Sequence, residues 1–226
     1  MSIWILIIVL IIIGVVLICL ICVRNKKKIN LEFAIETDPY TMPFVIDNFI
    51  SDAERKYIIE QSVDKLVDSK IVSGKNNLVR NSQQNWLPKT DTVIREIFDR
   101  ASRTFNLPIE NAEDLQVVRY KPGQYYNEHH DSCCDNNKHC QSFIKKGGQR
   151  ILTILIYLND DFEDGQTYFK NLNQKFKVKP GGAIVFYPLA SDSNKCHPKA
   201  LHAGLPVSSG EKWIANLWFR ERKFIK

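Results

Sequence analysis

The pattern of hydrophobic and polar residues changes twice along the chain. Residues 3–23 are uncharged and contain no proline, so they form one continuous apolar run. Residues 51–105 contain two stretches with apolar residues at helical intervals. After residue 113 the apolar residues occur in short runs that are rich in β-branched and aromatic side chains. These three textures predict a transmembrane helix, then a helical segment, then an all-β core.

The middle segment predicts two helices. Residues 51–67 begin with Ser51 and Glu54 at the spacing of a capping box. Residues 91–105 carry one apolar stripe, made of Val93, Ile94, Ile97, Phe98, Ala101 and Phe105. A linker over 30–41 and a strand over 43–50 precede them. We interpret both helices as scaffold. The chain is therefore expected to have three parts: an anchor with a basic flank at 1–29, a helical scaffold at 30–112 and a β core at 113–226.

The runs of the last segment have strand length and are separated by turn signals. They include "LQVVRY", "RILTILIYL", "AIVFY" and "KWIANLWF", with "KPGQ", "EDGQ", "KPGG" and "SSGE" among the intervening sequences. Many short strands of this kind predict a sandwich or a small barrel and not a βαβ fold. The fold class expected for the chain is therefore α+β, and mainly β.

The N-terminal run and its basic flank raise a question of topology. Twenty-one apolar residues at 1.5 Å rise can cross a hydrocarbon core of about 30 Å. The sequence "RNKKK" follows, which predicts an uncleaved anchor and, by the positive-inside rule, a domain on the cytosolic side. This flank supplies four of the six excess positive charges, and the remaining excess of about +2 speaks against nucleic acid as a partner.

The segment "YYNEHHD" offers candidate metal ligands. On a strand, side chains alternate between faces, so His129 and Asp131 would point together while His130 points away. Two histidines and one carboxylate suit non-haem Fe(II) with open coordination positions. Of the other histidines, only His202 lies in a predicted strand, which makes it the expected third ligand. Taken alone, an His-x-Asp pair with a distant histidine is a weak signal, and an exposed pair that binds no metal is the better interpretation of it.

The surroundings of this pair resemble the 2-oxoglutarate- and Fe(II)-dependent dioxygenases, and most closely the catalytic domain of collagen-type prolyl 4-hydroxylases. The resemblance is carried by "LQVVRYKPGQYYNEHHD", "GGQRILTILIYLND", "DGQTYF", "KPGGAIVFY" and "LHAGLPVSSGEKWIANLW". It covers about half of the chain, in the order and spacing of the family. It implies a double-stranded β-helix of the jelly-roll or cupin type, and an enzyme that hydroxylates peptidyl proline while 2-oxoglutarate becomes succinate and CO₂.

The resemblance also implies roles for individual residues. His129, Asp131 and His202 would be the iron ligands. Tyr120, Thr167 and Lys212 would hold 2-oxoglutarate, with Lys212 pairing with its distal carboxylate. Arg150 and Trp218 would lie near the peptide substrate or support its pocket. The implied cofactors and partners are Fe(II), 2-oxoglutarate, L-ascorbate, O₂ and a Pro-rich or collagen-like peptide.

Two positions depart from the family's pattern. Glu128 stands where the family usually has proline before the first iron ligand, and Arg220 stands where it often has histidine on the substrate side. The alternatives that remain are a dioxygenase acting on another residue such as lysine, and a non-catalytic metal-binding β-barrel module at a membrane.

The four cysteines of the domain leave a further choice open. Cys133, Cys134, Cys140 and Cys196 can form two disulfides in any of three pairings, or none. With His139 they could instead bind zinc, but C-C-x₄-H-C is not a usual structural-zinc spacing, so disulfides or free thiols are preferred. Disulfides would require an oxidising compartment. That agrees with the lumenal face of the endoplasmic reticulum membrane, which the resemblance implies, and conflicts with the positive-inside rule.

Overall fold

The computed structural model describes residues 40–69, 79–135, 137–190 and 195–226. The predicted anchor at 3–23 and most of the predicted linker lie outside these residues. Within the described ranges, no helix is long and apolar enough to cross a membrane.

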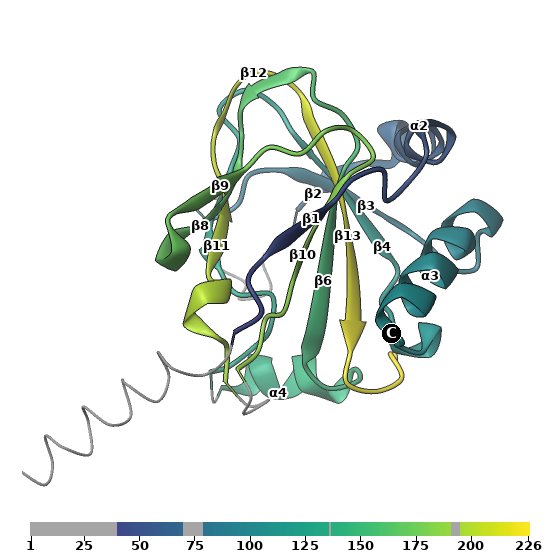
Figure 1. Cartoon of the computed structure of the whole chain (residues 1–226), viewed down its shortest axis with the longest axis vertical. Coiled ribbons are helices and arrows are strands. Elements are labelled where there is room, and N and C mark those ends of the chain that lie inside the picture. The colour runs from purple at the N-terminus through teal and green to yellow at the C-terminus, as the bar shows by residue number, and fades with distance from the viewer. Residues whose placement is uncertain (1–39, 70–78, 136, 191–194) are drawn as a thin grey trace, which may run out of the picture. The chain divides into compact units, whose positions relative to one another are not determined.

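Two antiparallel sheets and one strand pair form the body of the protein (Figure 1). The large sheet has the order β1 (Phe44–Ile46), β10 (Ala183–Phe186), β6 (Arg150–Tyr157), β13 (Lys212–Arg220), β4 (Leu115–Tyr120), β3 (Gln83–Leu87) and β2 (Val67–Asp68). The smaller sheet has the order β5 (Tyr126–His129), β11 (His202–Gly204), β8 (Thr167–Phe169) and β9 (Gln174–Phe176). β12 (Val207–Gly210) pairs with β7 (Phe162–Asp164).

The helices are few and short. The described residues include the helices α2 (Asp52–Glu60), α3 (Thr92–Phe105) and α4 (Lys138–Lys145). They also include short 3₁₀ turns at Val63–Lys65, Ile109–Asn111, Lys170–Leu172 and Pro198–Ala200. Figure 1 shows α2 and α3 on one side of the large sheet, and the smaller sheet on its other side. The prediction of a mainly β, jelly-roll-like fold is confirmed, and the division into parts at residue 112 stays a prediction.

Local signals explain where α2 and α3 begin. The Ser51 hydroxyl accepts a hydrogen bond from the Glu54 amide, while the Glu54 carboxylate accepts one from the Ser51 amide, so the predicted capping box is present. Asp91 caps α3 by accepting from two backbone amides. The first helix ends at Glu60 and not at residue 67, because the chain turns through Val63–Lys65 into β2.

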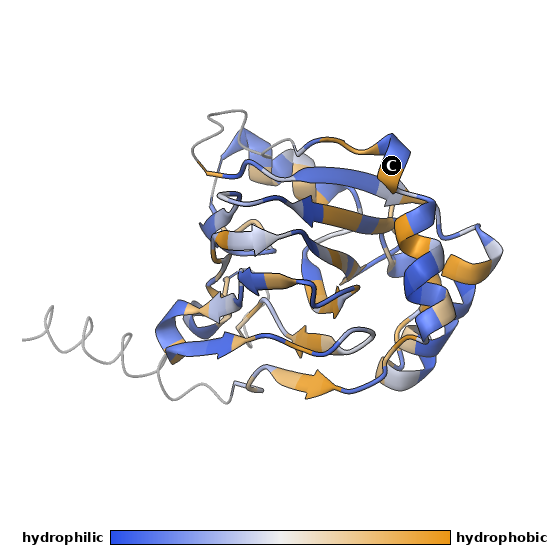
Figure 2. Cartoon of the chain, turned by 90° about the horizontal axis from the view of Figure 1, so that it is seen from above, coloured by the Kyte–Doolittle hydropathy of each residue, from blue (hydrophilic) through white to orange (hydrophobic). Residues whose placement is uncertain are grey.

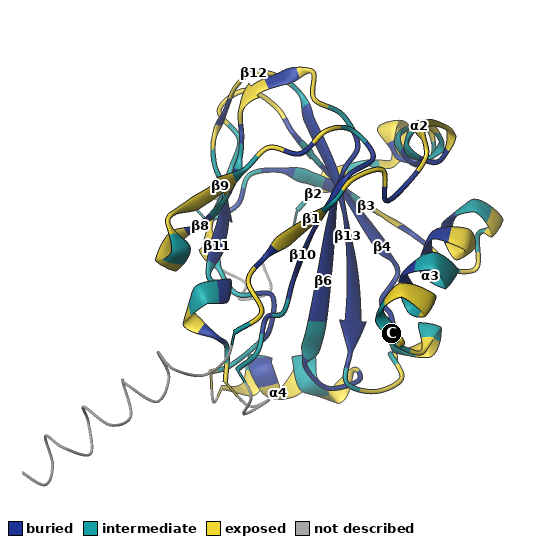
Figure 3. Ribbon diagram, in the orientation of Figure 1, coloured by how far each residue is buried: buried dark blue, intermediate teal, exposed yellow. Residues whose placement is uncertain are grey.

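The alternation of the central strands builds two separate apolar layers. In β6, Ile154 and Ile156 pack toward the helices, where α3 contributes Ile94, Ile97 and Phe98. Leu155 and Tyr157 point the other way and pack with Phe169 of the smaller sheet. Figure 3 shows these central strands as buried and the outlying helices as largely exposed on their outer faces. Figure 2 shows hydrophobic positions gathered along the middle strands and the inner side of the helices.

Two disulfides fix the chain just after the predicted metal ligands. Cys133 pairs with Cys140, and Cys134 pairs with Cys196. The first links the loop after β5 to α4, and the second links it to the segment before β11. Because all four thiols are consumed, the alternative of a zinc site built on them does not fit this structure.

Candidate active site

Strand pairing places the two histidines of the predicted triad opposite each other on adjacent strands. In the smaller sheet, His129 at the end of β5 stands directly opposite His202 at the start of β11. Their ring centroids are 4.3 Å apart. Asp131 lies two residues beyond His129, and its Oδ1 is 3.8 Å from the His129 Nε2. The ligand atoms of all three residues lie within 4.8 Å of one another, which is compact enough for one metal ion.

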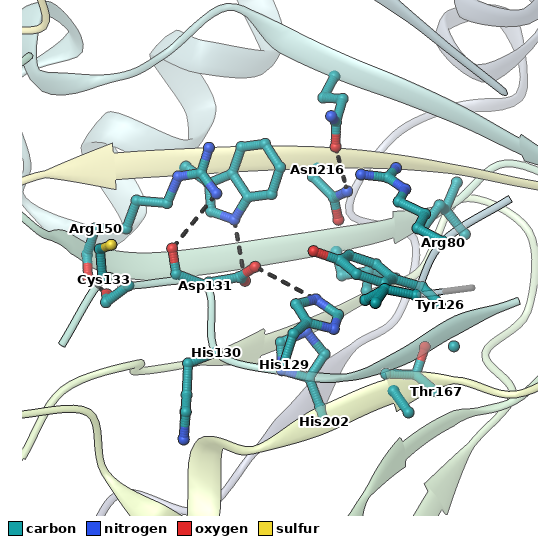
Figure 4. A pocket seen from close by; sticks show the side chains of 18 of the residues that line it. Arg80, Tyr126, His129, His130, Asp131, Cys133, Arg150, Thr167, His202 and Asn216 are labelled. Carbon is teal, nitrogen blue, oxygen red and sulfur yellow. Dashed lines mark hydrogen bonds and ion pairs between the residues drawn. The ribbon is translucent and has the colours of Figure 1, made fainter. Parts of the chain in front are cut away.

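Figure 4 shows His129, Asp131 and His202 converging, while His130 points away from them. This agrees with the alternation expected along a strand. The arrangement is therefore the two-histidine, one-carboxylate donor set that suits Fe(II), because it occupies one face of an octahedron and leaves the other face free.

Backbone carbonyls fix the orientation of both imidazoles. The His129 Nδ1 lies 2.8 Å from the Asn127 carbonyl, and the His202 Nδ1 lies 2.9 Å from the Ala200 carbonyl. A carbonyl can only accept, so Nδ1 carries the proton in each ring and Nε2 keeps its lone pair for a metal. Burial, and then the proximity of His202, hold the pKa of His129 well below its usual value, so this ring is neutral near pH 7.

Asp131 is held by two donors on one oxygen. Its Oδ2 accepts from the Thr153 hydroxyl at 2.7 Å and from the Trp218 indole Nε1 at 3.0 Å. The other oxygen, Oδ1, is left facing His129. Burial opposes ionisation of Asp131, but His202, His129 and Arg150 outweigh it and lower the pKa of the carboxyl. Asp131 is therefore a preoriented anion that could serve as a metal ligand.

Lys212 lines the same cavity and is unusual because it is a buried lysine. The cavity has a volume of about 420 Å³ and is lined by the triad together with Tyr120, Thr167 and Lys212. Lys212 is only 1% exposed, and its Nζ donates to the Gly165 carbonyl at 2.6 Å between the rings of Tyr120 and Tyr157. Burial lowers the pKa of Lys212 to about 7. No carboxylate among the described residues pairs with it, so the cavity offers a buried cation without a protein counter-ion.

The neighbouring predicted residues have well-defined positions. Thr167 begins β8, and its hydroxyl lies 2.9 Å from that of Tyr157. Tyr120 ends β4 directly opposite Lys212 in the adjacent strand, and burial raises its pKa, which keeps its hydroxyl protonated. All three side chains line the cavity that holds the triad.

Arg150 and Trp218 form a stack against the metal site. The Arg150 guanidinium lies 3.5 Å from the centroid of the Trp218 ring and donates to both oxygens of Glu113, at 2.6 and 2.9 Å. Arg150 Nη1 also donates to the Asp131 carbonyl at 3.4 Å. Both side chains line the cavity, so the prediction that they lie at the site agrees with their positions, while their roles toward a substrate remain proposals.

Arg220, the residue that departs from the family's pattern, is buried and does not reach the cavity around the triad. It is 2% exposed, its Nε donates to Glu113 at 2.8 Å, and its Nη1 donates to the carbonyls of Phe143 and Gly148. One carboxylate thus pairs with two arginines. Glu113, like Thr153, was missed by sequence reasoning, because its partners are 37 and 107 residues away along the chain.

Glu128, the other departure, lies on the surface. Its carboxylate pairs with Lys170 at 2.7 Å, and both side chains are about half exposed. A second missed group is the polar wall of the cavity, where Gln116 donates to Gln84 and Asn216 donates to Gln116. The sequence signal for this wall is weak: Gln116 and Asn216 are single amides within largely apolar strands.

Known proteins place this geometry in a family context. Residues 115–220 match the model of the 2OG-Fe(II) oxygenase superfamily. A protein of Acanthamoeba polyphaga mimivirus named "Putative prolyl 4-hydroxylase" is 59% identical over 204 residues, which cover 88% of this chain and 84% of that protein. Prolyl 4-hydroxylase 1 of Arabidopsis thaliana is 34% identical over 199 residues, covering 79% and 68% of the two chains.

Solved structures agree with these relatives. The crystal structure of the viral collagen prolyl hydroxylase from Paramecium Bursaria Chlorella virus-1, in complex with 2-oxoglutarate, is 37% identical in sequence and has a TM-score of 0.64. The match covers 79% of this chain and 95% of that one. A Pseudomonas putida prolyl-4-hydroxylase at 16% identity and a TM-score of 0.55 shows the same fold.

Proposed function

Since the chain belongs to the prolyl 4-hydroxylases of the 2OG-Fe(II) oxygenase superfamily, we propose that it hydroxylates prolyl residues in an extended, Pro-rich peptide. The observation that carries the proposal is the joint presence, in one cavity, of the His129–Asp131–His202 triad and the unpaired buried Lys212. A bare metal-binding module needs the triad but has no use for a buried cation in its cavity.

His129, Asp131 and His202 are the proposed iron ligands. The donor set fits Fe(II), since two imidazoles with Nδ1 bonded to backbone carbonyls present Nε2, and one anionic carboxylate presents Oδ1 on the same side. Fe(II) bound there supplies the oxygen-activating chemistry of the family, in which 2-oxoglutarate and O₂ are consumed and succinate and CO₂ are released.

Lys212 is the proposed anchor for the distal carboxylate of 2-oxoglutarate. A dianion that enters the cavity gives this cation the counter-ion that no described residue provides, and a charge-assisted hydrogen bond in a buried site is strong. Thr167 and Tyr120 line the same cavity and are the proposed hydrogen-bonding partners of the co-substrate. Ascorbate is the proposed external reductant, as in the related enzymes.

Trp218 and Arg150 have two proposed roles: the first is to hold Asp131 in place, and the second is to form a wall of the cavity that receives the substrate. The Trp218 indole fixes Asp131 through Nε1, while its ring and the guanidinium of Arg150 line the cavity where a substrate residue must reach the metal. Because Glu113 holds Arg150 with two hydrogen bonds, this wall is rigid before any peptide binds.

The test uses the full chain with Fe(II), 2-oxoglutarate and ascorbate, a set of Pro-rich peptides, and His202→Ala as the matched control. We expect succinate together with a one-oxygen mass gain on proline, and neither product from the variant. Oxygen gain on lysine in a lysine-containing peptide would assign a different substrate. Absence of succinate from folded, iron-loaded protein would contradict the enzyme and favour a binding module.

Residues 3–23 are the proposed membrane anchor, with the domain in an oxidising compartment. The two disulfides support this placement, because such bonds persist in oxidising environments. An engineered glycosylation sequon at an exposed position of the domain tests it: glycosylation in cells is expected, whereas an unmodified domain that protease reaches from the cytosolic side would contradict it.

A further inference from the structure

A second cavity adjoins the active-site cavity and shares part of its wall. It has a volume of about 460 Å³ and is lined mainly by apolar surface. Four residues line both cavities: Trp86, His139, Phe143 and Arg150. Direct contacts link Asp131 to this second cavity. The Trp218 indole donates a hydrogen bond to Asp131, and the Arg150 guanidinium stacks on the Trp218 ring. The same guanidinium lies 5.3 Å from the centroid of the Phe143 ring. The two cavities are therefore parts of one continuous surface.

The walls of the second cavity are aromatic and firmly held. Phe143 comes from α4 and Phe224 from the segment after β13, and both rings contact the Arg220 guanidinium, at 4.1 and 5.4 Å. Backbone hydrogen bonds hold the C-terminal segment on both sides, from the Phe224 amide to Glu110 and from the Ile225 amide to Lys146. Trp86 completes the wall and stays 39% exposed although it is a large aromatic residue. A rigid, partly exposed aromatic surface beside an active site favours a ligand.

The charges around the cavity disfavour cationic ligands. Lys146, Arg150, Arg220 and Lys226 line it, against Glu113 and Asp114. Glu113 is shared by the two arginines and Asp114 pairs with Lys226, so the cations are in excess. A neutral ring fits such a site, whereas a lysine or arginine side chain would meet repulsion.

We propose that the second cavity is a subsite for a proline ring of the same peptide, a few residues away from the one that is hydroxylated. This inference rests on the proposed function and deepens it, because it gives the enzyme a requirement for peptide length. Pro-rich segments adopt the polyproline II helix and dock their rings on aromatic grooves. The two cavities share four lining residues, and a polyproline II helix rises only about 3.1 Å per residue, so the second proline is expected a few residues from the first.

The test measures binding of three fluorescent peptides to the full chain, loaded with Fe(II) and 2-oxoglutarate under argon so that no turnover occurs. The core peptide is Gly-Ala-Pro-Ala-Gly, and the others add Pro-Ala-Pro-Ala at the N-terminal or the C-terminal side. We expect one extension, and only that one, to lower Kd about five- to tenfold. Replacing its prolines with lysine is expected to remove the whole gain.

Two protein variants locate the gain. Phe224 lines only the second of these two cavities, so Phe224→Ala is expected to abolish the benefit of the extension while Kd for the core peptide stays within twofold. Ile225→Ala is the matched control, because this neighbour is 62% exposed and lines neither cavity. Phe224→Leu keeps apolar bulk and is expected to retain part of the gain. An unchanged Kd for the core peptide reports that the variants are folded.

The outcomes separate the subsite from the proposed function. Equal gains from both extensions, an intact gain in Phe224→Ala, full affinity for the lysine peptide, or no gain at all would each overturn the subsite. The same peptides are then given O₂ and analysed by mass. A one-sided gain in affinity without any hydroxylated proline would leave the subsite standing and remove the prolyl hydroxylase activity, and hydroxylation without the gain would do the reverse.

Discussion

Replacing Lys212 with methionine is expected to stabilise the folded protein while it removes co-substrate binding. Lys212 is 1% exposed, and burial lowers its pKa from 10.5 to about 7. A shift of about 3.5 units corresponds to roughly 5 kcal/mol of destabilisation whenever the side chain is charged in the folded state, at 1.36 kcal/mol per unit. Loss of the hydrogen bond to the Gly165 carbonyl offsets about 2 kcal/mol of this. Near pH 6 the free energy of unfolding of the variant should therefore be about 3 kcal/mol higher than that of the wild type.

The pH dependence of this difference has a defined sign. Above pH 7 the folded wild type releases the Lys212 proton while the unfolded chain keeps it up to its ordinary pKa of 10.5. The unfolded state then binds more protons, so this group makes the wild type more stable as pH rises from 7 to 10.5. The advantage of the variant should shrink by about 1.4 kcal/mol per pH unit in that window and vanish near pH 9.

The assay is denaturant unfolding of the metal-free, co-substrate-free full chain at pH 6, 7.5 and 9, with Lys179→Met, an exposed lysine, as control. In parallel, calorimetry at pH 7 under argon should show 2-oxoglutarate binding to Lys212→Met weakened by a factor of about 100 or more, since an unpaired buried carboxylate costs several kcal/mol. A variant that is less stable than the wild type at pH 6, or that binds 2-oxoglutarate with unchanged affinity, would refute the reasoning.

Three further changes test other parts of the account. Trp218→Phe keeps an aromatic ring but removes the Nε1 donor to Asp131. The affinity for Fe(II), measured by competition with a chelator, should therefore fall about tenfold, and an unchanged affinity would contradict the positioning role. Cys134→Ser opens the disulfide to Cys196, which spans 62 residues, and should lower the free energy of unfolding by about 3 kcal/mol; a loss under 0.5 kcal/mol would show that the bond is not needed. Glu113→Gln leaves two buried arginines with a weaker partner and should cost about 3 kcal/mol in a denaturant titration, whereas Glu110→Gln on the surface should cost almost nothing.

The strands and the helix α3 could be predicted because each has a repeating apolar pattern of its own. The stripe on α3 packs against the large sheet as expected, with Ile94, Ile97 and Phe98 fully buried. β3 was not predicted, since its sequence "QQNWL" looks polar. One of its three amides, Gln84, lines the cavity and accepts a hydrogen bond from Gln116, so this strand contributes a polar residue to the wall of the site.

The site was predictable only where a short spacing encodes it. His129 and Asp131 are two residues apart, and Lys212 follows His202 by ten, so these positions could be read against a known pattern. The helix α4 was missed because "KHCQSFIK" is short, and its place depends on the disulfide from Cys140 to Cys133. The pairing of Glu113 with two arginines depends on strand order across the large sheet, which no local pattern encodes.

The central claim is that the cavity couples co-substrate oxidation to hydroxylation of a peptidyl proline. Its most direct test is a reaction of the full chain under ¹⁸O₂ with Fe(II), 2-oxoglutarate and a Pro-rich peptide, followed by mass analysis of both products. We expect one ¹⁸O atom in the hydroxyproline and one in succinate for each coupled turnover. Label in succinate with none in proline, or label in neither product, would contradict it.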